Sequence, residues 1–193
     1  MITIPETIWT RMLDEFEGEA REVEQVAYFD GIVIEDAERM VGVATTLTIP
    51  DALLEAGRFE VSPEAMSQAG KHFRRCRMQR LAQVHTHPSA WVGHSPWDDQ
   101  RAYSQAVGAI SIVLPDFARN RPTLEQAGVH VRTRTGWRQL SEEEKAQRLR
   151  LVPGYLDFRK HETKPITNLP TSVLTPRGRR WWHALAFWRN KEA

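Results

Sequence analysis

The sequence predicts a mixed α+β domain over residues 1–150, with a largely antiparallel β-sheet flanked by helices and a C-terminal extension over residues 151–193. In the first part, runs of β-branched and aromatic residues alternate with apolar positions at helical spacing. Beyond Pro153 the chain changes to a polar segment interrupted by prolines. The composition, with 41% hydrophobic and 26% charged residues, is globular and not that of a disordered chain.

A helix is expected near the start of the chain. Pro5 can occupy its first turn, where no backbone N–H is needed, and Gly18 marks its end. The apolar residues of this segment are spaced by three and four: Ile8, Met12, Leu13 and Phe16. The pattern therefore predicts a helix with one apolar face.

Three β-prone runs follow this helix. Residues 23–29 end at Asp30-Gly31, a turn dipeptide, and residues 32–34 resume the pattern beyond it. Residues 40–49 are rich in valine and threonine and end at a proline. Together these runs predict an antiparallel meander.

Capping residues mark the later helices. Ser62 followed by Pro63 predicts one helix N-terminus, and Ser95 followed by proline predicts a second helix that runs to about Val107. Ser141 starts a charged helix with capping-box spacing. The remaining strands are expected at residues 81–85, 109–114, 129–131 and 136–140.

Bulk properties exclude several classes of protein. The formal net charge of +1 provides no general surface for nucleic acid. The single cysteine, Cys76, excludes an internal disulfide and a paired-cysteine zinc module, and it fits a reducing compartment. No stretch approaches the ~18 apolar residues of a membrane span, and no signal sequence is recognisable. We expect a cytoplasmic protein.

The stretch from His85 to Asp98 is predicted to hold a metal ion. His85 and His87 lie two apart after a strand-like run, so both side chains project from one face. Asp98 follows eleven residues after His87, beyond a proline and a glycine that can turn the chain back. Two histidines and one carboxylate form a catalytic zinc set with a fourth position for water. The segment from Ser95 to Asp98 is also a good helix N-cap, and both interpretations can hold.

Hydrolysis at such a metal also needs a general base. Glu22 and Glu24 are the candidates at the start of the first β-prone run, and since they lie two apart they share one face. Residue type alone does not separate them. A thermolysin-like H-E-x-x-H helix is absent, because His161-Glu162 has no second histidine.

The motif H-T-H at 85–87, seven residues and then S-P-W-D at 95–98 resembles the signature of the JAMM metalloproteases, also called the JAB or MPN domain. Residues 24–31 resemble the segment that carries the catalytic glutamate of that family. Residues 59–65, which lead into a helix and then the histidine strand, are also similar. The likeness covers about residues 1–145.

This resemblance implies a layered, cytidine-deaminase-like architecture and a zinc isopeptidase that acts at the C-terminus of ubiquitin or a ubiquitin-like protein. It implies His85, His87 and Asp98 as Zn²⁺ ligands, Glu24 as the base and Ser95 as an oxyanion donor. The compact chain is similar to bacterial members associated with ubiquitin-like conjugation or antiviral defence operons. The cysteine-histidine insertion of some eukaryotic members, which holds a second zinc, is absent.

Three alternatives stay open. A non-catalytic scaffold of the same fold is disfavoured by the complete ligand set. A nucleic-acid-associated relative similar to RadC is disfavoured because Thr86 and Ala90 replace the asparagine and glycine of its histidine motif. Processing of a sulfur-carrier protein uses the same metal chemistry as isopeptidase action.

Aromatic residues suggest two further surfaces. Trp91 and Val92 either pack beneath the motif loop or line a groove for an extended substrate tail. His94 lies outside the motif and is not expected to be a ligand. The basic, tryptophan-rich segment 177–193 either docks on the domain or presents a surface to a partner protein.

Overall fold

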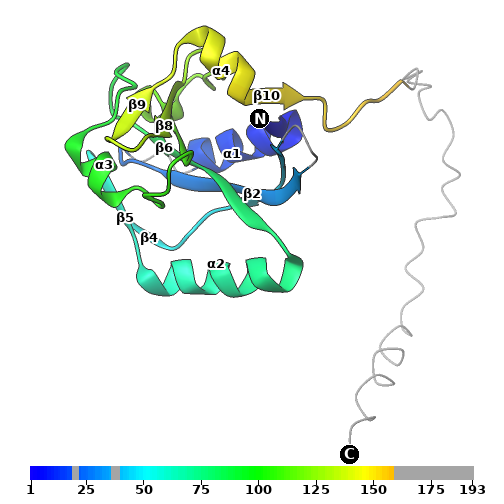
Figure 1. The fold of residues 1–193 in the computed structure, drawn as a ribbon. Coiled ribbons are helices and arrows are strands. Elements are labelled where there is room, and N and C mark those ends of the chain that lie inside the picture. Colours follow the sequence, from blue (N-terminus) through cyan, green and yellow to red (C-terminus); the bar gives the residue numbers. More distant parts are fainter. Residues whose placement is uncertain (19–21, 36–39, 159–193) are drawn as a thin grey trace, which may run out of the picture. The chain divides into compact units, whose positions relative to one another are not determined.

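An eight-stranded mixed sheet forms the centre of the computed structural model, which describes residues 1–18, 22–35 and 40–158 (Figure 1). The strand order is β10-β1-β3-β2-β6-β7-β8-β9. The strands are β1 (Ile2–Pro5), β2 (Val26–Glu35), β3 (Met40–Thr48), β6 (Gln79–Thr86), β7 (Ile110–Leu114), β8 (Gly128–Arg132), β9 (Trp137–Gln139) and β10 (Leu149–Val152). Neighbours pair antiparallel except at β1–β10, β1–β3 and β6–β7. The predicted mixed α+β class is confirmed.

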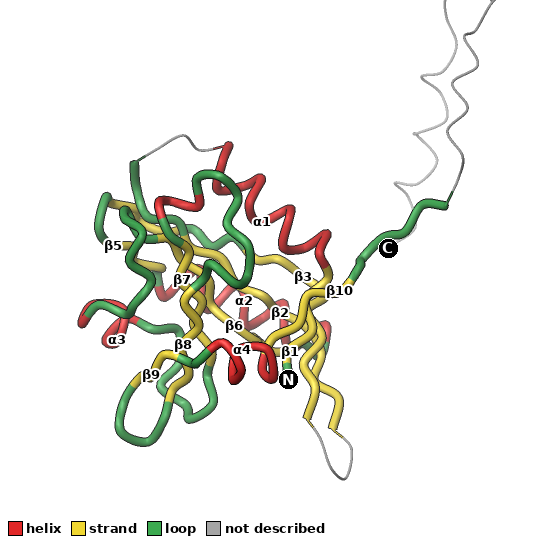
Figure 2. Tube along the Cα trace, turned by 90° about the horizontal axis from the view of Figure 1, so that it is seen from above, coloured by secondary structure: helices red, strands yellow, loops and turns green. Residues whose placement is uncertain are grey.

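Helices lie on both faces of this sheet. Figure 2 shows α1 (Glu6–Gly18) over one face and α2 (Pro63–Cys76) behind the other. The expected apolar face of α1 is buried in the main core, whereas α2 has no buried residue. The smaller elements are the hairpin β4 (Ala52–Glu55) and β5 (Arg58–Val61), α3 (Pro96–Arg101), the 3-10 turn η1 (Asp116–Ala118) and α4 (Glu142–Arg148). Among the described helices, none is long and apolar enough to cross a membrane.

The alternation along β2 divides the interior into two clusters. Ala27 and Phe29 belong to the main core with α1, whereas Val26 and Tyr28 belong to a smaller cluster with Phe59 of β5. Val26 is the register partner of His85 on β6. Because directly paired residues share a face, the histidine lies on the side of the smaller cluster, away from α1.

The prediction of a turn at Asp30-Gly31 is wrong. β2 runs through these residues as one strand, with a register shift in its pairing to both neighbours, which is a β-bulge. A Cβ on Gly31 would lie 1.9 Å from the carbonyl oxygen of Val43, so only glycine allows the close approach to β3. A turn dipeptide here supplies backbone freedom for a bulge and does not reverse the chain.

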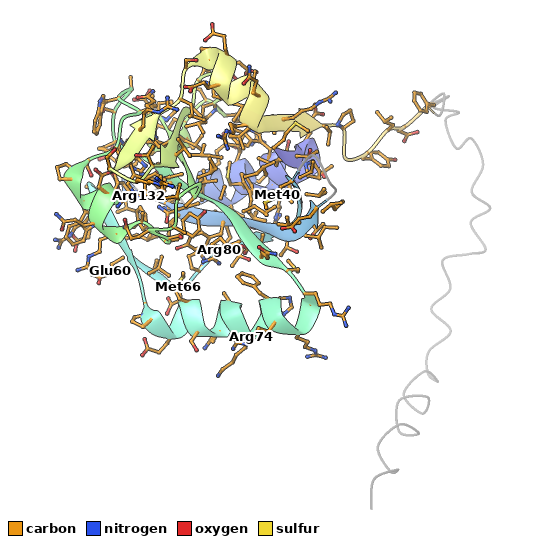
Figure 3. All side chains as sticks on the ribbon, viewed as in Figure 1. Met40, Glu60, Met66, Arg74, Arg80 and Arg132 are labelled. Carbon is orange, nitrogen blue, oxygen red and sulfur yellow. The ribbon has the colours of Figure 1, made fainter. Side chains whose placement is uncertain are left out.

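Arg80 connects the sheet to α2. It lies with Met66 between the sheet and the helix, whereas Arg74 points away from the outer side of α2 (Figure 3). The Nε atom of Arg80 lies 3.0 Å from Oδ1 of Asp30, which is fully buried, and the guanidinium also covers the ring of Tyr28 at 3.5 Å. A largely buried, ion-paired arginine therefore fills the space under a helix that has no buried residue of its own.

Several other elements differ from the expectations. The helix after Ser95 ends at Arg101 and not near Val107. The strands β1, β4, β5 and β10 were not predicted, and β10 carries the sheet to Val152, beyond the expected domain end at residue 150. The chain divides into two compact units, Met1–Leu156 and Asp157–Ala193. The segment 177–193 lies outside the described residues, so the expectation about it stays a prediction.

Candidate metal centre

Three side chains from the strand and the following loop and helix come together at the end of β6. His85 lies within the strand, His87 directly follows it and Asp98 lies in the first turn of α3. Their donor atoms all lie within 4.8 Å of one another, and all three residues are buried. The Nε2 atom of His85 is 3.4 Å from Oδ1 of Asp98, and Nε2 of His87 is 3.3 Å from Oδ2.

These separations fit a shared metal ion. In a tetrahedral site with bonds of about 2.0–2.1 Å, two ligand atoms lie about 3.3–3.4 Å apart. Two imidazoles and a carboxylate are the donors that zinc takes in catalytic sites, with a fourth position left open. The residues therefore fit a divalent metal such as zinc.

The capping box of α3 positions Asp98. The backbone N–H of Ser95 donates to Oδ2 of Asp98 at 2.7 Å, and Oγ of Ser95 accepts from the backbone N–H of Asp98 at 3.2 Å. The helix cap and the candidate metal site therefore share the residue Asp98, so both interpretations of this segment hold together. The capping box that stabilises the helix start therefore also orients the carboxylate, through the backbone N–H of Ser95.

Burial and mutual pairing shift the pKa values of the three residues. Burial lowers the pKa of His85, which keeps its imidazole neutral. Burial acts in the same direction on His87, but its pairing with Asp98 outweighs this and the pKa is raised. For Asp98 burial favours protonation, yet the pairing with both histidines holds the pKa well below the usual range of a carboxyl.

The structure distinguishes the two candidate glutamates. Glu24 is 3% exposed, and burial raises its pKa to about 7, although the charge of His87 opposes this. The side chain of Glu22 is 81% exposed and pairs with Arg119 at 3.3 Å. The environment of Glu24, and not that of Glu22, is that of an acid–base group.

A pair of hydrogen bonds ties the Glu24 segment to the histidine strand. The backbone N–H of Gln25 donates to Oγ1 of Thr86 at 2.8 Å, and the N–H of Thr86 donates to the carbonyl of Gln25 at 3.1 Å. On its other side, the N–H of Glu24 donates to the carbonyl of Glu55 in β4 at 2.8 Å. The residue between the two histidines therefore anchors the segment that carries the glutamate.

The motif loop covers the site. Trp91 is 55% exposed, and its ring stacks on His87 with centroids 5.1 Å apart. Val92 is half-buried, and its carbonyl oxygen lies close to Gly128 of β8. A Cβ on this glycine would be 2.0 Å from that oxygen. Trp91 therefore has the exposure of a binding residue, whereas Val92 packs under the loop.

Two histidines near the site were not foreseen as part of its surroundings. The His94 ring lies 5.9 Å from that of His85 and stacks on His130 of β8 at 4.1 Å. The sequence places His94 only outside the motif, and no local pattern connects it to His130 on a distant strand. Only the pairing of β7 with β8 brings His130 to this face.

Comparison with known proteins yields structural similarity alone. No family model matches the sequence, and no curated protein matches it. Protein DSY2949 from Desulfitobacterium hafniense, solved in solution, has a TM-score of 0.58 and 17% identity, over 79% of this chain and 94% of its own. AF2198, a JAB1/MPN domain protein from Archaeoglobus fulgidus, has a TM-score of 0.42 and 16% identity, over 78% of this chain and 98% of its own. The first likeness is one of fold, and the second is too low to carry an argument.

Proposed function

We propose that this chain is a JAMM-type zinc isopeptidase or peptidase, which hydrolyses the bond after the C-terminus of ubiquitin or a ubiquitin-like protein. One observation carries the proposal: the donors of His85, His87 and Asp98 converge beside a buried glutamate, Glu24, at the motif spacing that resembles this family. Zinc held by the three residues supplies the Lewis acidity that makes water a nucleophile near neutral pH. A cytoplasmic location belongs to the same proposal.

Glu24 is the proposed general base. With a pKa of about 7 it is partly ionised at neutral pH, so it can take a proton from the attacking water. The protonated carboxyl then gives that proton to the departing amine. Such transfer contributes typically about 10²- to 10⁴-fold to the rate.

Ser95 is the proposed oxyanion donor. Its Oγ accepts the N–H of Asp98 in the helix cap, which leaves the hydroxyl proton to point at the carbonyl oxygen of a substrate. One donor of this kind is worth about 2.7–4 kcal/mol in the transition state. The cap holds the hydroxyl beside the ligand Asp98 before substrate arrives.

The exposed ring of Trp91 favours a substrate with an extended C-terminal tail. This ring covers His87 and offers an apolar wall at the entrance to the site. A flexible C-terminal tail could lie along this wall and gain affinity through main-chain pairing, a common mode of peptide recognition.

Metal analysis and cleavage assays test the proposal together. Purified protein is expected to bind one zinc and to cleave a ubiquitin-like fusion after its terminal glycine, with loss of cleavage in chelator and in Glu24→Gln. Mass spectrometry of the products identifies the bond. A panel that includes sulfur-carrier proteins distinguishes the processing alternative. Stoichiometric zinc without any cleavage would favour the scaffold, and absence of zinc would refute the metal centre.

A further inference from the structure

The two candidate histidine ligands are supported in different ways. Nδ1 of His87 lies 3.0 Å from the carbonyl of Trp91. Nδ1 of His85 has no hydrogen-bond partner in the part of the chain that the structure describes, although this residue is fully buried. Ligand histidines usually fix their ring orientation through the second nitrogen. Apart from the contact of its Nε2 with Asp98, the ring of His85 is therefore oriented by packing.

Aromatic rings enclose His85. Phe59 of β5 lies 5.3 Å away, with ring planes inclined by 44°. His94 lies 5.9 Å away, with an inclination of 49°. These two rings come from the β4–β5 hairpin and the motif loop, which are segments separate from the strand that carries His85.

His94 is itself fixed from several sides. Its Nδ1 atom lies 2.9 Å from Oδ1 of Asp99, and its side chain is 6% exposed. Its ring stacks on His130, with centroids 4.1 Å apart and planes 23° apart, and contacts Trp137 at 5.0 Å. A carboxylate partner, a stack and burial together leave the ring one orientation.

We propose that His94 is a positioning residue for the metal ligand His85: its ring, held by Asp99 and stacked on His130, restricts rotation of the His85 imidazole. This inference rests on the metal binding of the proposed function. His94 is not a ligand of the same ion, because the group of converging donors among the described residues contains only His85, His87 and Asp98. Its contribution is preorganisation, since a ligand already held in place loses less freedom when the metal binds.

Zinc affinity of four full-length variants tests the role. His94→Ala removes the ring, His94→Phe keeps a ring without nitrogen atoms, and Asp99→Asn weakens the contact that orients it. His72→Ala is the control, because it removes an exposed histidine on α2. Competition with a chromophoric chelator gives the dissociation constants, the absorption spectrum of the cobalt-substituted protein reports the ligand geometry, and melting without metal reports the fold.

His94→Ala is expected to weaken zinc binding by about tenfold and to change the cobalt spectrum, as loss of a residue that supports a ligand does. His94→Phe should retain most of the affinity, and Asp99→Asn should fall between them. If His94→Ala binds zinc as tightly as the unaltered chain, the positioning role is refuted. Equal losses in His94→Ala and His94→Phe would also refute it, because the nitrogen atoms and not the ring would then matter.

One outcome separates this inference from the proposed function. An unaltered protein that binds zinc but cleaves no substrate contradicts isopeptidase activity and leaves the comparison of variants valid. If His94→Ala does not fold, His94→Gln replaces it, since glutamine fills much of the space without a ring. Undiminished zinc binding by His94→Gln then overturns the positioning role.

Discussion

The carbonyl oxygen of Trp91 lies 3.0 Å from Nδ1 of His87, and this contact determines which nitrogen of His87 faces Asp98. A carbonyl can only accept a hydrogen bond, so Nδ1 carries the proton. Nε2, which lies 3.3 Å from Oδ2 of Asp98, is then the nitrogen left to bind a metal ion held between the two side chains. The conformation of the motif loop is therefore part of the metal site, although no loop residue between His87 and Asp98 is a ligand.

Gly93→Ala is expected to weaken metal binding by about tenfold, because it displaces the Trp91 segment that orients His87. A Cβ at position 93 would lie 2.6 Å from the Trp91 ring, so the ring must move. Zinc affinity by chelator competition measures the effect. Gly57→Ala is the matched control, since a Cβ there meets nothing within 4 Å. Equal affinity of the two variants would contradict the role of the loop.

Glu24→Gln is expected to stabilise the metal-free protein at high pH and not at low pH. The folded-state pKa of about 7 lies above the ordinary 4.5, so the folded form binds the proton more tightly than the unfolded form. Stability is then lost as pH rises from about 4.5 to 7, by up to about 3 kcal/mol. Glutamine removes this loss.

Urea unfolding in the presence of chelator, repeated from about pH 4 to 8, measures the difference. The Glu24→Gln gain should grow from near zero to its full value across this range. Glu22→Gln, in which the altered side chain is 81% exposed, is the matched control. A gain that is constant with pH would indicate a packing effect and not a buried ionised carboxylate.

The sequence indicated the three candidate metal ligands because their chemistry and spacing are local. His85 and His87 project from one strand face, and the Ser95 cap brings Asp98 back, so short-range rules suffice. The environment of Glu24 depends on burial by distant segments, including the hydrogen bond to Glu55. From spacing alone, Glu24 and Glu22 are equivalent candidates. Only the fold shows that Glu24 is buried and Glu22 is exposed.

Ser95→Gly is expected to reduce kcat by about 10²- to 10³-fold while zinc affinity changes little. Glycine is tolerated at an N-cap, where it costs only a few tenths of a kcal/mol, and its backbone N–H still donates to Asp98. The assay compares steady-state cleavage with zinc affinity in the same preparation. A parallel loss of zinc would show that the hydroxyl acts through the cap and not on the substrate.

Arg80→Met is expected to destabilise the protein by about 3–5 kcal/mol, because it leaves the fully buried Asp30 without its ion-pair partner. Arg101→Met is the control, since its pair with Glu60 is half exposed and is worth about 0–1 kcal/mol. Denaturant unfolding measures both. Similar small losses would indicate that the space under α2 admits water.

The bulge at Asp30-Gly31 shows why part of the sheet escaped prediction. Asp-Gly is a strong local signal for a turn, but the same backbone freedom permits a bulge when neighbouring strands approach closely. The pairing of Asp30 with Arg80, far along the chain on β6, makes the continuous strand favourable. Short strands such as β1 and β10 likewise exist only through their pairing with each other and with β3.

Thr86 links the segment that carries Glu24 to the strand that carries His85, through its two hydrogen bonds to Gln25. Asp98 comes from a separate element, α3. Under the proposed function, the base and the two histidine ligands are therefore held next to each other before a substrate arrives.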